Sequence, residues 1–353
     1  MNIGIPCETK PWEGRVALVP EACADLVAAG HRVRVEQGAG VASGFSDAAY
    51  VQAGAEIVSE AQTLYARSDL VVKVKEPIGA EPDWLRAGQI LFCFLHLAAM
   101  PELAERLAAS GVTAIAFETV READGRLPIL QPMSWIAGRL AVIQGLRYLQ
   151  RQEGGRGLLL GGVPGVERGR VTVVGGGNVG GQAARLAAAL GATVTVLDKD
   201  ARKLEALERA APNLSALYPY GRTLERAVAE ADLLVGAVLV PGARAPRVVS
   251  RAQVAAMAAG SVAVDVAVDQ GGCLETTRPT SYDDPVYVAE GVTHFAVTNM
   301  PGAVPRSASL ALCAALLPWV RRLAETDWRS QPVLSEAVNV DRGEVLPGPW
   351  RKA

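Results

Sequence analysis

Residues 170–198, RVTVVGGGNVGGQAARLAAALGATVTVLD, decide the fold. A β-branched run leads into Gly175, Gly177 and Gly180 in GxGxxG register, an alanine-rich helix follows, and a second β-branched run ends at Asp198. The first glycine permits the tight turn, the second lets the backbone approach a pyrophosphate, and the third lets the helix pack on the strand. The segment therefore predicts a βαβ unit that binds a dinucleotide.

Asp198 lies about 20 residues beyond the glycine loop, where an acidic side chain accepts the ribose 2′-hydroxyl. The same carboxylate repels a 2′-phosphate, so we expect NAD as the cofactor rather than NADP. Lys199 follows at once and weakens this preference.

The rest of the chain repeats the same alternation of short β-branched runs and amphipathic runs. It begins at NIGIP, reaches DLVVKVK at 69–75 and GQILFCFLH at 88–96, and restarts after a glycine-rich stretch at 154–169. This alternation is typical of α/β proteins with parallel sheets. Since 353 residues exceed one ordinary core, we expect two Rossmann-like, doubly wound domains with a cleft between them. A helix is expected over 134–150, capped by Ser134, and another near 307–326.

Composition excludes several classes of function. Hydrophobic residues make up 50% of the chain and the net charge is -2, which disfavours disorder and nucleic-acid binding. The five cysteines are scattered and form no CxxC pair, so neither a disulfide framework nor a metal site is expected. The opening NIGIPC resembles a strand rather than a secretory leader, so we expect none, and no apolar run reaches the roughly 20 residues that cross a bilayer. We expect a cytoplasmic protein without a membrane partner.

Four polar residues stand where strands of a parallel sheet end or turn. Arg15 follows the first strand, Lys75 ends DLVVKVK, His96 ends FCFLH, and Asp269 ends SVAVDVAVD. Ligands of open α/β sheets bind at such carboxyl ends. Each residue alone has an ordinary structural explanation, but together they suit a small keto or amino acid. We expect Lys73, set back along the strand, to be structural and its replacement to cost little in reaction rate.

The chain resembles the alanine dehydrogenase family and its transhydrogenase relatives over residues 1 to about 340. The stretches that carry the resemblance are ETKPWEGRVALVP, VVKVKEP, LHLAA, LPILQPMSWIAGRLA, GGVPGVERGRVTVVGGG, LVGAVLVPGARAP, VDVAVDQGGCLETTRPT and NMPGAVPRS. It implies a substrate domain of residues 1–128 and 307–353, an NAD-binding domain of residues 129–306, and a homo-oligomer, with a hexamer favoured over a dimer.

The resemblance also implies roles for single residues. Arg15 and Lys75 would bind the substrate, and His96 and Asp269 would act as the acid/base pair. Cofactor contacts are implied for Ser134, Asp198, Lys203, Leu239 and Asn299.

The implied reaction is reversible NAD-dependent oxidative deamination of L-alanine to pyruvate and ammonia. The sequence departs from the family pattern at Met100, Trp135 and Tyr220, so a dehydrogenase or imine reductase for another amino or imino acid stays open. A transhydrogenase-like nucleotide-binding subunit and a catalytically silent NAD-binding protein are further alternatives.

Overall fold

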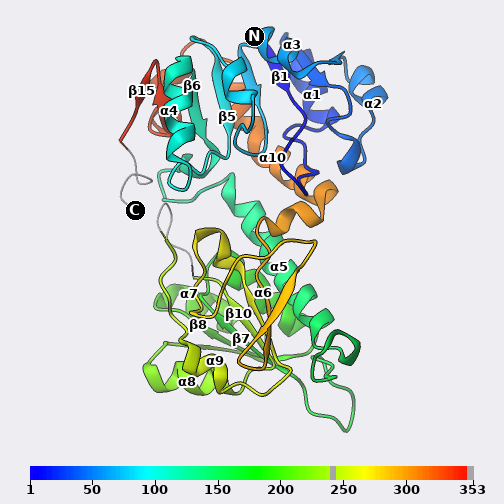
Figure 1. Ribbon diagram of the computed structural model, residues 1–353, viewed down its shortest axis with the longest axis vertical. Helices are drawn as coiled ribbons and strands as arrows, with labels where there is room; N and C mark the ends of the chain where they lie inside the picture. Colours follow the sequence, from blue (N-terminus) through cyan, green and yellow to red (C-terminus); the bar gives the residue numbers. More distant parts are fainter. Residues whose placement is uncertain (239–243, 348–353) are drawn as a thin grey trace. The chain divides into compact units, whose positions relative to one another are not determined.

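The computed structural model describes residues 1–238 and 244–347, and the chain divides into two compact units (Figure 1). The first unit is Met1–Met133 with Pro301–Ala353, and the second is Ser134–Met300. The boundaries expected from the sequence, 128/129 and 306/307, lie a few residues from these. The N-terminal and C-terminal parts of the chain thus build one unit together, and the middle part builds the other.

The first unit contains an eight-stranded sheet in the order β15-β14-β6-β5-β4-β1-β2-β3. Strands β1 to β6 are parallel, while β14 runs antiparallel to β6 and β15 antiparallel to β14. The strands are β1 Asn2–Ile5, β2 Arg32–Glu36, β3 Glu56–Val58, β4 Leu70–Val72, β5 Ile90–Cys93, β6 Thr113–Ala116, β14 Val338–Asp341 and β15 Glu344–Val345. The strand order reverses between β1 and β4, which makes the end of these strands the expected ligand-binding edge.

Short helices connect these strands, and apolar side chains of both layers form the core. Leu91 of β5, Leu107 of α4 and Val340 of β14 are fully buried in one cluster. The helices are α1 Pro20–Ala28, η1 Val41–Ser43, α2 Asp47–Gln52, α3 Ala61–Ala66, η2 Glu81–Trp84, α4 Pro101–Ser110, η3 Phe117–Thr119, α10 Pro305–Leu323, η7 Trp328–Ser330 and α11 Pro332–Ser335.

Helix α10, drawn orange in Figure 1, confirms the helix expected near 307–326. It packs on α1 and η1 of the first unit. The hydroxyl of Ser309 accepts a hydrogen bond from the Val16 amide, which fixes the helix to the loop after β1.

The second unit contains a seven-stranded sheet in the order β12-β13-β11-β10-β7-β8-β9. All its neighbouring strands are parallel except the β12–β13 pair, so the order again reverses once, between β7 and β10. The strands are β7 Arg170–Val174, β8 Thr193–Leu197, β9 Leu214–Leu217, β10 Leu233–Gly236, β11 Val262–Asp265, β12 Val286–Ala289 and β13 Val292–Phe295. Both units therefore show the doubly wound α/β order predicted from the alternating pattern.

The helices of the second unit include α6, which follows the glycine loop directly. Its helices are α5 Leu130–Tyr148, η4 Arg151–Glu153, α6 Asn178–Ala189, α7 Ala201–Glu208, α8 Gly221–Ala229, α9 Arg251–Ala255, η5 Val266–Gln270 and η6 Met300–Ala303, of which α5 and η6 cross the unit boundaries.

Helix α5 begins at Leu130, so the expected cap at Ser134 is wrong. Pro132 lies in the first turn, where backbone N–H groups have no partner inside the helix and proline is tolerated. Ser134 consequently lies within the helix.

No helix among residues 1–238 and 244–347 combines the length and the apolar character needed to cross a membrane. All five cysteines lie in this part of the chain, and each is a free thiol.

Candidate functional site

The carboxyl ends of three adjacent strands, β5, β4 and β1, carry the predicted residues of the first unit. Arg15 lies in the segment after β1, Lys75 in the segment after β4 and His96 in the segment after β5. Each of these segments leaves the sheet at the same edge because the strands are parallel. The sheet thus gathers the three residues at its switch point.

Strand β4 ends at Val72, so the expectation that it extends to Lys75 is wrong. The backbone still follows β5 for two residues, since the Lys73 amide donates to the Phe92 carbonyl at 3.2 Å and the Phe94 amide to the Val74 carbonyl at 3.0 Å. Beyond that point the chain turns away, and Lys75 stands at the edge of the sheet rather than within it.

Lys73 is a structural residue. Its side chain is 1% exposed, and Nζ lies 2.8 Å from both carboxylate oxygens of Glu81. Burial alone would lower the pKa of Lys73, but the charges of Glu8 and Glu81 raise it above its usual value. The ammonium is therefore held charged inside the unit.

Glu8, which the sequence reasoning missed, holds the backbone that carries Lys75. Its carboxylate accepts the Val74 amide at 2.5 Å and the Lys75 amide at 3.1 Å, and its side chain is 2% exposed. Burial, with a contribution from Glu13, raises the pKa of Glu8 to about 7, although Lys73 and the two amides act in the opposite direction. A signal was present in the sequence, where Glu8 follows the first strand after only two residues.

Arg15 is also buried, and an acid orients its guanidinium group. Nε and Nη2 donate to the two oxygens of Glu13 at 2.6 and 2.5 Å, and Nη1 donates to the sulfur of Met133 at 3.2 Å. Paired hydrogen bonds of this type fix the plane of a guanidinium group. The side chain of Arg15 is thus positioned before any substrate arrives.

His96 keeps 40% of its side chain exposed and is anchored at both backbone and ring. Its backbone has a positive φ of 49°, and its amide donates to Glu118 at 2.7 Å. Ring atom Nδ1 lies 3.0 Å from Glu76 Oε2. The other oxygen of Glu76 accepts from Lys10 Nζ at 2.6 Å.

In the second unit the glycine loop has the geometry that the motif predicts. Gly175 has a φ of 100°, and a side chain there would lie 2.6 Å from the Ala237 carbonyl oxygen. At Gly180 an added Cβ would lie 1.7 Å from the Gly175 oxygen, so only glycine lets α6 approach the loop. At Gly177 an added Cβ meets nothing within 4 Å, which leaves that side of the loop open to a ligand.

Asp198 directly follows β8 and lies beside the glycine loop. Its carboxylate accepts the Gly176 amide at 2.7 Å and the Asp200 amide at 2.8 Å, and Lys203 Nζ lies 3.6 Å away. The loop, the N-terminus of α6 and this acid fit a dinucleotide, because the helix end offers amides to phosphates and the acid can accept a ribose hydroxyl.

The remaining predicted residues lie elsewhere in the second unit. Asp269 lies in η5 and is exposed, and its Oδ1 accepts the Asn299 amide at 3.3 Å. Asn299 has a positive φ of 58°. Ser134 is the first residue of this unit, and Leu239 lies outside the described residues.

Asp265, at the end of β11, shapes the loop that carries Asp269. Its carboxylate accepts the amides of Ala267 at 3.0 Å and Cys273 at 2.8 Å. The sequence reasoning did not single it out.

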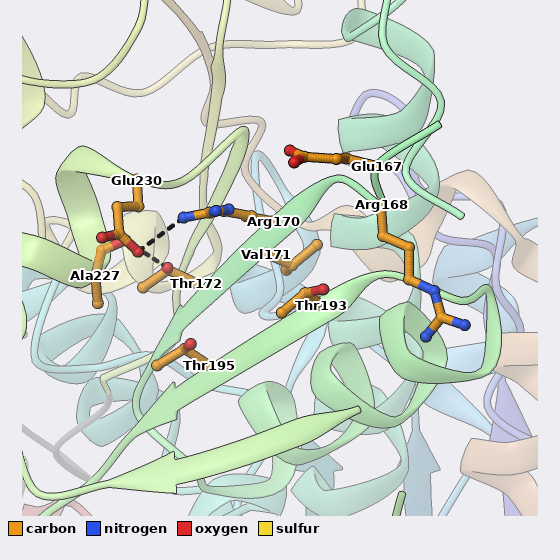
Figure 2. Close-up of a pocket in the computed structure, with 9 residues that line it drawn as sticks. All are labelled: Glu167, Arg168, Arg170, Val171, Thr172, Thr193, Thr195, Ala227 and Glu230. Carbon is orange, nitrogen blue, oxygen red and sulfur yellow. Dashed lines mark hydrogen bonds and ion pairs between the residues drawn. The ribbon is translucent and has the colours of Figure 1, made fainter. Parts of the chain in front are cut away.

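A pocket of about 320 Å³ lies at the opposite, amino edge of the second sheet (Figure 2). Threonines of β7 and β8 line it, and Arg170 pairs with Glu230 across it at 3.0 Å. It contains none of the predicted residues and lies where β7 and β8 begin, so it is separate from the glycine loop.

Fold and site together define a class: a two-unit α/β protein of the Rossmann type, with a glycine-rich nucleotide loop in one unit and a cluster of buried acids and bases in the other. Two family models match the chain, "Alanine dehydrogenase/PNT, N-terminal domain" over residues 4–137 and "Alanine dehydrogenase/PNT, C-terminal domain" over residues 141–347. The chain belongs to the alanine dehydrogenase/PNT family, as the sequence motifs indicated.

Several relatives cover nearly the whole chain. The alanine dehydrogenase of Mycobacterium tuberculosis (strain H37Rv) is 48% identical over 98% of this chain and 95% of its own length. That of Bacillus subtilis (strain 168) is 50% identical over 92% of this chain and 86% of its own. A solved L-alanine dehydrogenase structure superposes with a TM-score of 0.96 at 49% identity, covering 100% of this chain and 98% of that chain.

A solved transhydrogenase from Sinorhizobium meliloti has the same fold. It superposes with a TM-score of 0.86 at 26% identity, covering 98% of this chain and 99% of that chain.

Proposed function

We propose that this protein catalyses the reversible oxidative deamination of L-alanine to pyruvate and ammonia, with NAD as the cofactor. The observation that carries the proposal is the full-length similarity to alanine dehydrogenases, in a chain that contains Arg15, Lys75, His96 and Asp269. In the balanced reaction, L-alanine, NAD⁺ and water give pyruvate, ammonium, NADH and one proton.

The residues of the first unit bind and polarise the substrate. Arg15, oriented by Glu13, pairs with the substrate carboxylate, for which a planar guanidinium is suited. Lys75 places its ammonium at the carbonyl oxygen of pyruvate and stabilises negative charge that develops there.

His96 and Asp269 handle the protons. A nicotinamide cofactor held at the glycine loop and Asp198 would supply the acceptor for the hydride that leaves Cα of alanine. His96 takes a proton from the water molecule whose oxygen adds at Cα, and Asp269 serves the amine nitrogen as the C–N bond breaks. The exposed imidazole of His96 suits exchange with a small reactant.

NADH oxidation in the presence of ammonium tests the proposed substrate. Pyruvate should give the highest kcat/KM in a panel of 2-keto acids. A higher value for another keto or imino acid would assign that substrate instead. Hydride transfer between two nucleotides without any amino acid would favour a transhydrogenase activity, which the solved relative makes a specific alternative.

Replacing Asp198 by Asn tests the choice of cofactor. The side-chain amide of asparagine has a single acceptor oxygen, so it can keep the bond to the Gly176 amide or to the Asp200 amide but not both, and it loses the charge that repels a 2′-phosphate. We expect the wild type to prefer NAD over NADP and the variant to narrow the ratio of kcat/KM values. Lys203→Ala is the matched control, because it removes the neighbouring cation. An unchanged ratio in Asp198→Asn would remove this carboxylate from the ribose site.

A further inference from the structure

Glu76 connects the segments that follow three adjacent strands. It lies after β4, and its carboxylate bonds to Lys10 after β1 and to His96 after β5. The distances are 2.6 Å from Oε1 to Lys10 Nζ and 3.0 Å from Oε2 to His96 Nδ1. Glu76 is 3% exposed, whereas the side chains of Lys10 and His96 are 39% and 40% exposed, so the carboxylate is buried and its two partners reach solvent.

The carboxylate of Glu76 is ionised at neutral pH. Burial alone would raise its pKa, but the hydrogen bonds from His96 and Lys10 and the charge of Lys75 bring the pKa well below its usual range. An ionised carboxylate can only accept hydrogen bonds. The proton of a neutral His96 ring therefore lies on Nδ1, and Nε2 carries the lone pair.

The surroundings of His96 fix the residue from several directions. Glu118 accepts the backbone amides of Leu95 and His96, and the ring stacks on Phe94 with 5.8 Å between centroids. The charged groups that face the residue are thus Glu76 at the ring and Glu118 at the backbone, with Lys10 and Lys75 acting through Glu76. The positive φ of His96 persists because these contacts over-determine it.

We propose that Glu76 is a positioning residue, which orients the His96 imidazole and holds it in the tautomer whose Nε2 is the base. The inference rests on the proposed function for its catalytic meaning, and on the contact between Glu76 and His96 for its geometry. A His with a fixed tautomer delivers one nitrogen to the reaction, as the carboxylate partners of catalytic and metal-bound histidines do elsewhere.

A purely structural role predicts a different result. If Glu76 only ties the loops together, losing either end of the Lys10–Glu76 ion pair should have the same effect. Lys10→Met removes the ion pair but keeps the bond to His96, whereas Glu76→Gln removes the charge beside His96 and keeps the size of the side chain.

The first test compares kcat and its pH dependence in these two variants. Glu76→Gln should lower kcat by about 10-fold to 1,000-fold and move the acid limb of the profile to lower pH, because the negative charge that favours the protonated ring is lost. Lys10→Met should keep kcat within about threefold and should not move the limb downward. NADH affinity, measured by fluorescence titration, should be unchanged in both. Equal losses and equal profiles in the two variants would overturn the proposal.

The second test does not need turnover. The chain has three histidines, so solid-state ¹⁵N spectra of histidine-labelled protein can resolve them, with His96→Asn identifying the signals of interest. At pH 8 the wild type should show a protonated Nδ1 and an unprotonated Nε2 at His96, and Glu76→Gln should add the other tautomer. A wild-type ring protonated at Nε2 would refute the inference even if the enzyme turns over alanine. The predicted spectra from a protein inactive on every keto acid would leave the geometry standing and remove the proposed function alone.

Discussion

Lys73 and Lys75 are both buried, and their contacts give these two similar residues different roles. Lys73 is paired with Glu81 at 2.8 Å and serves the interior of the first unit. Lys75 stands two residues further on, with its backbone amide bound by Glu8, and is still only 8% exposed. The first lysine neutralises buried acids, and the second is proposed to offer its charge to the substrate.

Replacing each lysine should separate the two roles. Lys75→Ala should lower kcat by about 10²–10³-fold, since it removes the group that stabilises charge on oxygen. Lys73→Ala should instead cost on the order of 3–5 kcal/mol of unfolding free energy, because Glu81 and Glu8 remain buried without their cation. That loss of Lys73 costs little in rate stays a prediction, and the buried ion pair adds the expected loss of stability. Steady-state kinetics and urea unfolding of both variants measure the two effects. A Lys73→Ala protein as stable as the wild type would contradict the structural role of Lys73.

Glu8 should make stability depend on pH. Its pKa is raised from 4.5 to about 7 by folding, so the unfolded chain loses this proton first as the pH rises. The contribution of protonated Glu8 to the free energy of unfolding is fully present below about pH 4.5. It is lost as the pH rises through 7, a change of at most about 3 kcal/mol. Urea unfolding at pH 5 and pH 7.5 should show the wild type losing more stability than Glu8→Gln over that interval. Parallel losses in both proteins would remove Glu8 as the cause.

At the scale of elements, the glycine loop and α6 give a matched pair of variants. Gly180→Ala should destabilise the second unit by about 1–3 kcal/mol, because its methyl group would collide with the Gly175 oxygen. Gly177→Ala meets no protein atom and should fold normally, yet bind NADH more weakly since the methyl group occupies space beside the loop. Thermal unfolding and NADH titration measure the two effects. Normal NADH affinity in a folded Gly177→Ala protein would exclude this side of the loop as the pyrophosphate site.

Local patterns predicted the repeated elements well and the irregular ones poorly. The alternation of strands and helices, the glycine loop and α10 follow from periodicity and turn residues. The β12–β13 hairpin turns at Glu290 and Gly291, which have φ values of 53° and 74°. Two-residue hairpin turns with positive φ at both positions are usually Asn-Gly or Asp-Gly, so the Glu-Gly pair did not predict this hairpin. Strands β14 and β15 are short, and β14 depends on its pairing with β6, which is remote in sequence.

The residues of the site were predicted where strand ends placed them, but their partners were not. Lys75 and His96 were chosen as strand-end residues, although β4 ends at Val72 and β5 at Cys93. Glu8 and Glu76 contact segments that are far apart in the sequence, and Glu13 acts because it is buried beside Arg15. The spacing of residues predicts neither long-range contacts nor burial. Carboxylates near basic residues are common in any sequence, so only the three-dimensional contacts distinguish these three.

For the whole molecule, we propose a homo-oligomer, a hexamer before a dimer, in the cytoplasm. Family membership supports the oligomer, and closed symmetric assemblies are the commonest oligomers of soluble proteins. The five free cysteines support a reducing compartment such as the cytoplasm. Light scattering on the purified chain at micromolar concentration should give a mass near six times 37.0 kDa. A mass equal to one chain would contradict assembly altogether.

The first unit is built from both ends of the chain, and this affects how it folds during synthesis on the ribosome. Residues 134–300 emerge as one continuous segment and can complete their sheet during synthesis, whereas β6 waits for β14, which is made more than 200 residues later. Until then the edge of β6 is unpaired, and such edges invite association with other chains. Nascent chains that stop after residue 300 should therefore be the form most dependent on chaperones. The edge of β6 stays open to other chains until β14 has been synthesised and pairs with it.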